Sequence, residues 1–147
     1  GLFAIGPWDK KLFRVAGVAL SLNDVEHRIL RPIWRDPRIH YAVNCAALGC
    51  PNLQGEAFTG ANTERLLEAA ARAFVNHPRG VMVKGERLVV SSVYVWFQED
   101  FEGTDTGVIR HLKRYAEPPL EAALDGVERI EDHAYDWRLN AVPIASN

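Results

Sequence analysis

The order of apolar and polar positions predicts helices in four segments, 21–34, 62–77, 106–116 and 118–126. The clearest is 62–77, "NTERLLEAAARAFVNH", where an apolar stripe faces one way and charged residues face the other. The stripe consists of Leu66, Leu67, Ala70, Ala73 and Phe74. In segment 21–34, Ser21 and Asp24 have the spacing of a capping box, and Pro32 ends or kinks the helix.

Extended segments are predicted between these helices. Residues 39–44 follow an Asp-Pro turn and are rich in β-forming residues, so we expect a strand there. On such a strand, Ile39, Tyr41 and Val43 share one face, and His40, Ala42 and Asn44 share the other. A hairpin is expected over 81–93 with its turn at 84–86, and a short strand before Gly17.

The C-terminal part completes the pattern. A short helix or turn is expected over 94–101, and one or two strands over 127–140. In the last strand, Tyr135, Trp137 and Leu139 alternate with Asp136, Arg138 and Asn140. Helices and strands mix without regular βαβ order, which predicts an α+β fold: a small mixed sheet packed with three to five helices in a single domain, 1–147.

Composition narrows the range of partners. Apolar residues make up 48% of the 147 residues and charged residues 24%, which is enough for a real core. The net charge is −2 with both signs interspersed, so nucleic acid is not an expected partner. No run of eighteen apolar residues predicts a membrane span, and no leader pattern opens the sequence. Because the sequence opens at Gly1 without Met, we expect the C-terminal, larger part of a longer domain.

Both cysteines lie in "RIHYAVNCAALGCP", residues 38–51. A disulfide is the first of four arrangements that fit them, and it needs Cα atoms roughly 4.4–6.8 Å apart. Residues five apart reach that separation in an irregular loop but not in an α-helix, where they rise about 7.5 Å. Gly49 and Pro51 favour the loop and therefore permit a Cys45–Cys50 bridge.

Cys45 is also a candidate catalytic nucleophile, because it directly follows the expected strand. A thiol nucleophile needs a base within hydrogen-bond reach. His40 would lie roughly 16 Å away along a strand that rises about 3.3 Å per residue. The expected base is therefore His27 of the preceding helix, oriented by Glu26 or Asp136.

Two other arrangements of the cysteines stay open. Cys45, Cys50, His40 and His27 carry the donor atoms that zinc takes, although the spacing is not that of a tight C-x2-C pair. Alternatively, both thiols pack in the core as small apolar groups. Neither a metal nor another cofactor is expected.

Further residues are candidates for binding or for packing. Arg38, His40 and Asn44 are candidate binding residues, with a turn salt bridge to Asp36 as the alternative for Arg38. Glu99, Asp100, Glu102 and Asp105 are expected on a solvated surface, where a hard cation such as calcium is the alternative. Trp96, Phe97 and Phe101 are expected in the core, with an exposed aromatic groove as the alternative. His77, His111 and His133 are expected on the surface.

Several phrases together resemble one family. They are "LSLNDVEHRILRP", "DPRIHYAVNCAALGCPNL", "AFTGANTERLLEAAARAFVNHPRGV", "VYVWFQEDF" and "YDWRLN". They are similar to the DUF547 domain, a family of unknown function. The resemblance implies that an upstream helical stretch with an Asn-x-Tyr-Asn-Ala phrase is missing here, leaving an apolar face open to a homo-oligomer contact. It also implies export, because bacterial members are often exported, with a cytoplasmic location as the alternative.

Two functions follow from these observations. The first is a non-catalytic binding or scaffold module with bridged cysteines and a small-molecule or protein partner. The second is a thiol-dependent enzyme, a hydrolase or acyltransferase, with Cys45 as nucleophile and His27 as base. The first is favoured because no complete catalytic constellation is visible in the sequence.

Overall fold

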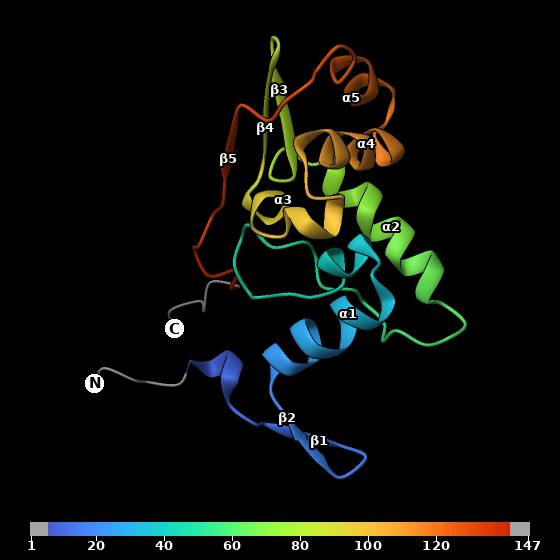
Figure 1. Cartoon of the computed structure of the whole chain (residues 1–147), viewed down its shortest axis with the longest axis vertical. Helices are drawn as coiled ribbons and strands as arrows, with labels where there is room; N and C mark the ends of the chain where they lie inside the picture. Colours follow the sequence, from blue (N-terminus) through green and yellow to red (C-terminus); the bar gives the residue numbers. More distant parts are fainter. Residues whose placement is uncertain (1–5, 142–147) are drawn as a thin grey trace, which may run out of the picture.

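The structure is a computed structural model, and it describes residues 6–141 (Figure 1). It has the predicted α+β architecture, with a three-stranded mixed sheet, a separate two-stranded hairpin and surrounding helices. The strands are β1 (Phe13–Val15), β2 (Val18–Leu20), β3 (Val81–Lys84), β4 (Arg87–Ser91) and β5 (Asp132–Ala134). The α-helices are α1 (Arg31–Trp34), α2 (Thr63–Val75), α3 (Ser92–Trp96), α4 (Asp105–Tyr115) and α5 (Pro118–Ala123). No helix in the described part is both long and apolar enough to cross a bilayer.

The main core lies between α2, α4 and the β3–β4 hairpin. The stripe of α2 is buried nearly as predicted, except that Ala71 and not Ala73 faces the core. Leu112 of α4 and Leu88 of β4 are fully buried against this face. Burying a side chain of this size stabilises the fold by about 1.5–3 kcal/mol, so this contact carries much of the stability.

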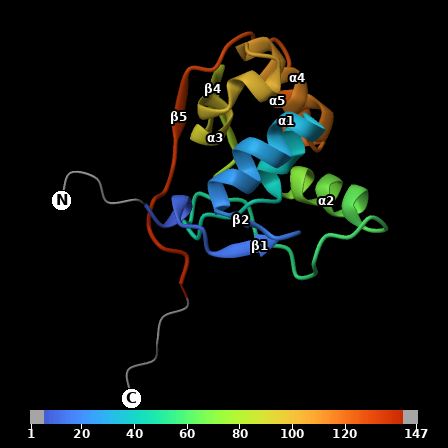
Figure 2. The same cartoon turned by 60° about the horizontal axis from the view of Figure 1, so that its bottom comes forward.

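The three-stranded sheet consists of the β3–β4 hairpin and one strand from the C-terminal segment. The predicted hairpin is confirmed: β3 and β4 pair antiparallel around a tight turn in which Gly85 has a φ of +62°. β5 then joins β4 in parallel, with Val90 opposite His133. In Figure 2, β5 runs along one side of the molecule and α2 lies on the other.

The N-terminal helical segment contains a wide turn. The capping box is present, because Ser21 N donates to Asp24 Oδ2 at 2.7 Å and Asp24 N donates to Ser21 Oγ at 3.1 Å. Residues Asp24–Leu30 (η2) are π-helical, and Arg31 N donates to Glu26 O five residues earlier. Such a wide turn relieves the clash between the Pro32 ring and the carbonyl one turn before it. The helix therefore continues past Pro32 to Trp34.

The predicted strand over 39–44 is wrong, because residues Pro37–Tyr41 form a 3-10 helix, η3. Asp36 caps this turn by accepting from Arg38 N at 2.9 Å, and Pro37 supplies the φ value of a first helical turn. Three consecutive side chains, Ile39, His40 and Tyr41, are all buried. A strand with one buried face could not bury three neighbours in a row.

Smaller expectations also need correction. The helix expected over 106–116 begins one residue earlier, and Thr104 caps it by accepting from Gly107 N at 3.0 Å. Phe101, in the short 3-10 helix η4 (Gln98–Phe101), is in the core as predicted. Trp96 is not in the core, because 47% of its surface is exposed.

Candidate functional site: a groove beside the Cys45–Cys50 bridge

The loop that carries the cysteines is fixed by the C-terminal segment. Its backbone is irregular from 42 to 50, so no helix begins at Cys45. The strand predicted over 39–44, directly before Cys45, is also absent. Leu48 N donates to Arg138 O at 2.8 Å, and Asn140 N donates to Ala46 O at 2.8 Å. Two segments about ninety residues apart in sequence thus lie antiparallel, side by side.

Asn44 holds the loop from inside. Its Oδ1 accepts from Ala46 N at 2.8 Å, and its Nδ2 donates to Pro51 O at 2.8 Å. Ala46 has a φ of +63°, an uncommon conformation for a residue with a side chain. Both polar ends of the Asn44 amide are therefore occupied by loop backbone.

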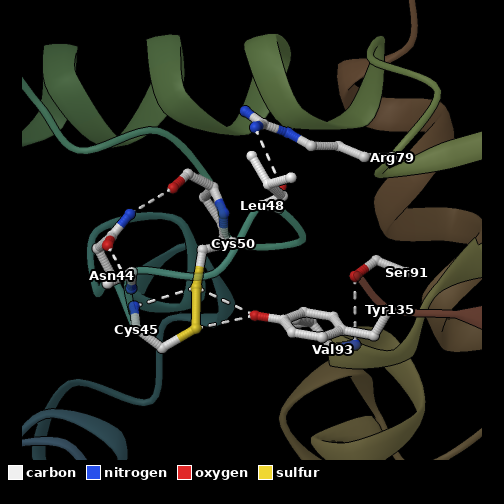
Figure 3. The surroundings of a disulfide bond; sticks show 10 residues. Asn44, Cys45, Leu48, Cys50, Arg79, Ser91, Val93 and Tyr135 are labelled. Carbon is white, nitrogen blue, oxygen red and sulfur yellow. Dashed lines mark hydrogen bonds between the residues drawn. A yellow bond between two sulfur atoms is a disulfide. The ribbon is translucent and has the colours of Figure 1, made fainter. Parts of the chain in front are cut away.

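Cys45 and Cys50 form a disulfide in the structure, with sulfur atoms 2.06 Å apart and Cα atoms 6.2 Å apart. The Tyr135 hydroxyl points at the bridge and lies 2.9 Å from Cys45 Sγ and 3.0 Å from Cys50 Sγ (Figure 3). Cys45 N donates to Cys50 Sγ at 3.0 Å. Cys50 is buried and Cys45 is half-buried, so the two sulfurs have different access.

Gly49 allows the tyrosine to come this close. A Cβ atom at Gly49 would lie 2.9 Å from Asp136 N and 3.0 Å from the Tyr135 ring. Gly49 N also donates to Asp136 O at 2.9 Å. The missing side chain thus lets the loop and the C-terminal segment make direct contact.

A groove of about 750 Å³ opens beside the bridge. Its walls come from five separate parts of the chain, including Trp8 near the N-terminus, and most of the lining is apolar. The apolar lining includes Leu22, Val25, Val43, Val93, Trp96, Phe97, Tyr135, Trp137 and Leu139. The polar lining includes Asn23, Glu26, His27, His40 and Asn44. The volume lies within the range of roughly 300–1,000 Å³ of small-molecule sites.

Three aromatic side chains form one wall of the groove. Tyr135 and Trp137 have ring centroids 4.7 Å apart, and both contact Trp96, at 4.8 and 5.4 Å. Trp137 is 69% exposed. Trp96 and Trp137 therefore present apolar faces to solvent instead of filling the core, while Tyr135 is half-buried between the groove and the bridge.

The helix of residues 22–34 supplies the polar side of the groove. Glu26 and His27 line it together with Cys45. His27 is exposed, and its Nδ1 lies 3.2 Å from Arg31 Nη1, so this nitrogen accepts from the guanidinium. Asp136 does not line the groove. It pairs with Arg138, whose hydrogen bonds lower the pKa of Asp136 to about 2.

His40 is not remote from the cysteines, because there is no strand to separate them. It lines the same groove as Cys45. Its Nε2 lies 2.7 Å from Asp100 Oδ2, and its buried Nδ1 has no partner among the described residues. Burial lowers the pKa of His40, although the Asp100 carboxylate opposes this shift. His40 is therefore a neutral imidazole held in one orientation by a carboxylate.

Arg38 and Asp100 are occupied by ion pairs. The Arg38 guanidinium binds Asp36 and also both oxygens of Glu64, at 2.6 and 2.9 Å. Asp100 accepts from Arg31 Nε at 2.6 Å as well as from His40. Burial alone would raise the pKa of Asp100, but these hydrogen bonds outweigh it and the pKa lies below its ordinary value. Asp100 is thus not simply part of a solvated acidic surface.

The zinc arrangement is not formed. Within residues 6–141, no group of three or more His, Cys, Asp or Glu side chains is placed to hold a metal ion. The calcium alternative at the acidic cluster fails for the same reason.

A family model described as "Protein of unknown function, DUF547" matches residues 4–75. These residues belong to the DUF547 family. The DUF547 segment includes the helix with Glu26 and His27, the bridge loop and α2. The phrases containing Trp96 and Tyr135 lie outside the matched range, so the match is shorter than the resemblance of the phrases. No curated protein and no solved structure gives a significant match to the chain.

The sequence predicts an exposed aromatic groove at Trp96 only as the alternative to the core, and the orientation of His40 was missed. The predicted strand over 135–140 is not formed, because β5 ends at Ala134, yet Tyr135, Trp137 and Leu139 all line the groove. Nothing in the sequence indicated that Trp96 of α3 and the DUF547 segment would meet these side chains. The pairing of His40 with Asp100, sixty residues later, also had no local signal.

Proposed function

We propose that this domain is a non-catalytic binding module and that the groove beside the bridge takes a small organic molecule. The single observation that carries the proposal is the exposed wall of Trp96, Tyr135 and Trp137 over a groove of about 750 Å³. Aromatic side chains left open to water in a concave site supply a large apolar contact area at low entropic cost.

The lining indicates the chemistry of the ligand. A planar apolar body fits the aromatic wall, because offset or tilted aromatic contacts add about 0.5–1.5 kcal/mol beyond area burial. A polar group on that body fits the opposite side, where Glu26 can accept a hydrogen bond and His27 lies next to Arg31. We therefore expect an amphipathic small molecule.

Titration with the fluorescent anion anilinonaphthalene sulfonate tests the proposal, because the dye combines an aromatic body with one charged group. We expect saturable binding of one dye per chain, followed by dye fluorescence. Trp137→Ala removes much of the exposed wall and should weaken binding roughly tenfold, the equivalent of about 1.4 kcal/mol.

Trp34→Ala is the matched control. Trp34 is also exposed but does not line the groove, so its removal should leave dye affinity unchanged. Binding that does not saturate, or that weakens equally in both variants, would contradict the proposal.

A second candidate is the thiol-dependent enzyme, favoured by the observation that Cys45, Glu26 and His27 line one groove. His40, held by Asp100, is a further candidate base. Because a bridged sulfur cannot act as a thiolate, this activity requires reduced protein.

Chromogenic ester hydrolysis by the reduced protein tests this second function. Cys45→Ser should abolish hydrolysis while Cys50→Ser retains it, and His27→Gln should reduce it by 100-fold or more. Equal loss in both cysteine variants would exclude Cys45 as the nucleophile.

We also propose that the protein is exported, since disulfides persist in oxidising compartments. Intact mass of protein isolated from its own cell without reductant tests this. A mass lower by two hydrogens supports the bridge in the native compartment, and two free thiols would count against it.

The β1–β2 hairpin is proposed as a contact between two copies of the chain. A two-stranded hairpin alone is marginal in water, and β1–β2 forms its own sheet with mostly exposed side chains. It projects from the body at the bottom of Figure 1. Pairing with a second hairpin would satisfy its edges and cover Leu12, Val15 and Val18.

A further inference from the structure

We infer that the Cys45–Cys50 bridge is a thiol–disulfide exchange site, with Cys45 as the sulfur that an incoming thiol attacks and Cys50 as the leaving group. The inference goes beyond ligand binding and does not depend on it. It rests on the different surroundings of the two sulfurs and on the hydroxyl that contacts both.

Access distinguishes the two sulfurs. Both cysteines line the groove, so a small thiol can approach the bridge from solvent. Cys50 is only 4% exposed, whereas Cys45 is half-buried. Because attack on a disulfide needs an open path to one sulfur, access favours Cys45.

Hydrogen bonds distinguish the sulfurs in the same sense. Cys50 Sγ has two donors, Cys45 N at 3.0 Å and the Tyr135 hydroxyl at 3.0 Å. Cys45 Sγ has one, the same hydroxyl at 2.9 Å. Donors stabilise a thiolate more than a thiol, and the sulfur with the more stable thiolate leaves faster. Cys50 is therefore the better leaving group.

The chemical step balances with an external thiol as the reductant. The incoming thiolate bonds to Cys45 Sγ, the Cys45–Cys50 bond breaks, and its electron pair stays on Cys50 Sγ, where the two donors hold the thiolate. A second external thiolate then attacks the external sulfur of the mixed disulfide and releases the Cys45 thiolate. Two external thiols are oxidised to their disulfide, and the protein bridge is reduced to two thiols.

Tyr135 is placed to follow the charge during this step. Its hydroxyl is nearly equidistant from the two sulfurs, at 2.9 Å from Cys45 Sγ and 3.0 Å from Cys50 Sγ. It can therefore donate to Cys50 as the bond breaks and to Cys45 in the reverse direction. The ring is fixed by Trp96 and Trp137, so little reorganisation is needed.

Reduced glutathione is the probe that tests the assignment of the two sulfurs. The oxidised protein is mixed with glutathione at neutral pH, alkylated rapidly with N-ethylmaleimide, and mapped by peptide mass. We expect glutathione on Cys45 and the maleimide on Cys50. Glutathione on Cys50, or on both equally, would overturn the assignment.

The mixed disulfide can be lost if Cys50 re-forms the bridge faster than N-ethylmaleimide alkylates it. Single-cysteine variants, which cannot re-form the bridge, then test the same assignment. Oxidised glutathione should form a mixed disulfide with Cys50→Ser, through Cys45, about tenfold faster than with Cys45→Ser, through Cys50. Equal rates, or a faster reaction of Cys45→Ser, would also overturn the assignment.

Tyr135→Phe tests the role of the hydroxyl while keeping the ring in the aromatic wall. Opening of the bridge by glutathione should slow about fivefold, as expected when one hydrogen bond is lost. Tyr115→Phe removes a hydroxyl outside the groove and should not change the rate. An unchanged rate in Tyr135→Phe would contradict this role. Because dye binding needs only the ring, Tyr135→Phe should still bind the dye, so this test is independent of the proposed ligand site.

Discussion

At the scale of single residues, the buried Tyr41 and Tyr94 and the half-buried His111 form a chain of hydrogen bonds in the core. Tyr94 Oη lies 3.1 Å from Tyr41 Oη, which lies 2.7 Å from His111 Nε2. A neutral His111 accepts from Tyr41, and Tyr41 then accepts from Tyr94, so both hydroxyls donate within the chain. Burial lowers the pKa of His111 to about 4. His111 is therefore a half-buried part of this chain and not the surface residue that the sequence predicts.

His111 makes stability depend on pH. Its folded pKa of about 4 lies below the unfolded value of 6.5, so the unfolded state binds the proton first as pH falls. Above pH 6.5, the contribution of neutral His111 to the free energy of unfolding should be complete. As pH falls from about 6.5 to 4, the free energy of unfolding should decrease by roughly 2–3 kcal/mol. Urea denaturation at several pH values measures this loss.

The His111→Gln variant isolates that contribution. Its stability should decrease less over the same pH range, although His40 retains a loss of the same sign because its pKa is also lowered. His77→Gln is the control, since His77 is exposed, and its profile should match that of the unmodified protein. Identical profiles for all three proteins would exclude His111 as the source.

At the scale of elements, Asp24 fixes the start of the helix that carries Glu26 and His27. It accepts from Ser21 N and Ser21 Oγ, and it pairs with Lys11 and with Arg28. These hydrogen bonds, led by that from Lys11, hold the pKa of Asp24 well below its usual range. The polar side of the groove is thus anchored at one end of its helix.

Removing this cap should loosen the polar side of the groove. Ser21→Ala deletes one partner of the capping box and should lower the free energy of unfolding by about 1 kcal/mol. Thr106→Ala, at an exposed position in the first turn of α4, should change it by less than about 0.5 kcal/mol. Chemical denaturation measures both, and equal effects would show that the cap adds nothing.

Elements that depend on local chemistry could be predicted from the sequence. Helix α2 follows from its apolar stripe, and the β3–β4 hairpin follows from the turn at Gly85. The strand over 39–44 was wrong because β-forming residues outweighed the Asp36-Pro37 cap, which starts a 3-10 turn. The groove could not be predicted, since its walls meet only through contacts distant in sequence.

At the scale of the whole molecule, the hairpin contact predicts a dimer. Leu12, Val15 and Val18 are 64%, 56% and 59% exposed, and Val15 pairs with Val18 across the two strands. Light scattering after size exclusion should give a concentration-dependent dimer. Val15→Lys should shift it to monomer, because charge on an edge strand opposes pairing.

Leu53→Lys is the control for this experiment. Leu53 is also highly exposed but lies in the loop before α2, so the charge there should leave the association unchanged. A monomer at all concentrations for the unmodified protein would contradict the hairpin contact.

The antiparallel pairing of residues 46–49 with 136–140 has a consequence for synthesis on the ribosome. Chains emerge at about 5–20 residues per second, so the cysteine loop waits several seconds before its partner segment exists. During that interval the two thiols have neither Tyr135 nor the aromatic wall beside them. A nascent chain stalled before Tyr135 should therefore form the Cys45–Cys50 bridge more slowly than a chain that has fully emerged.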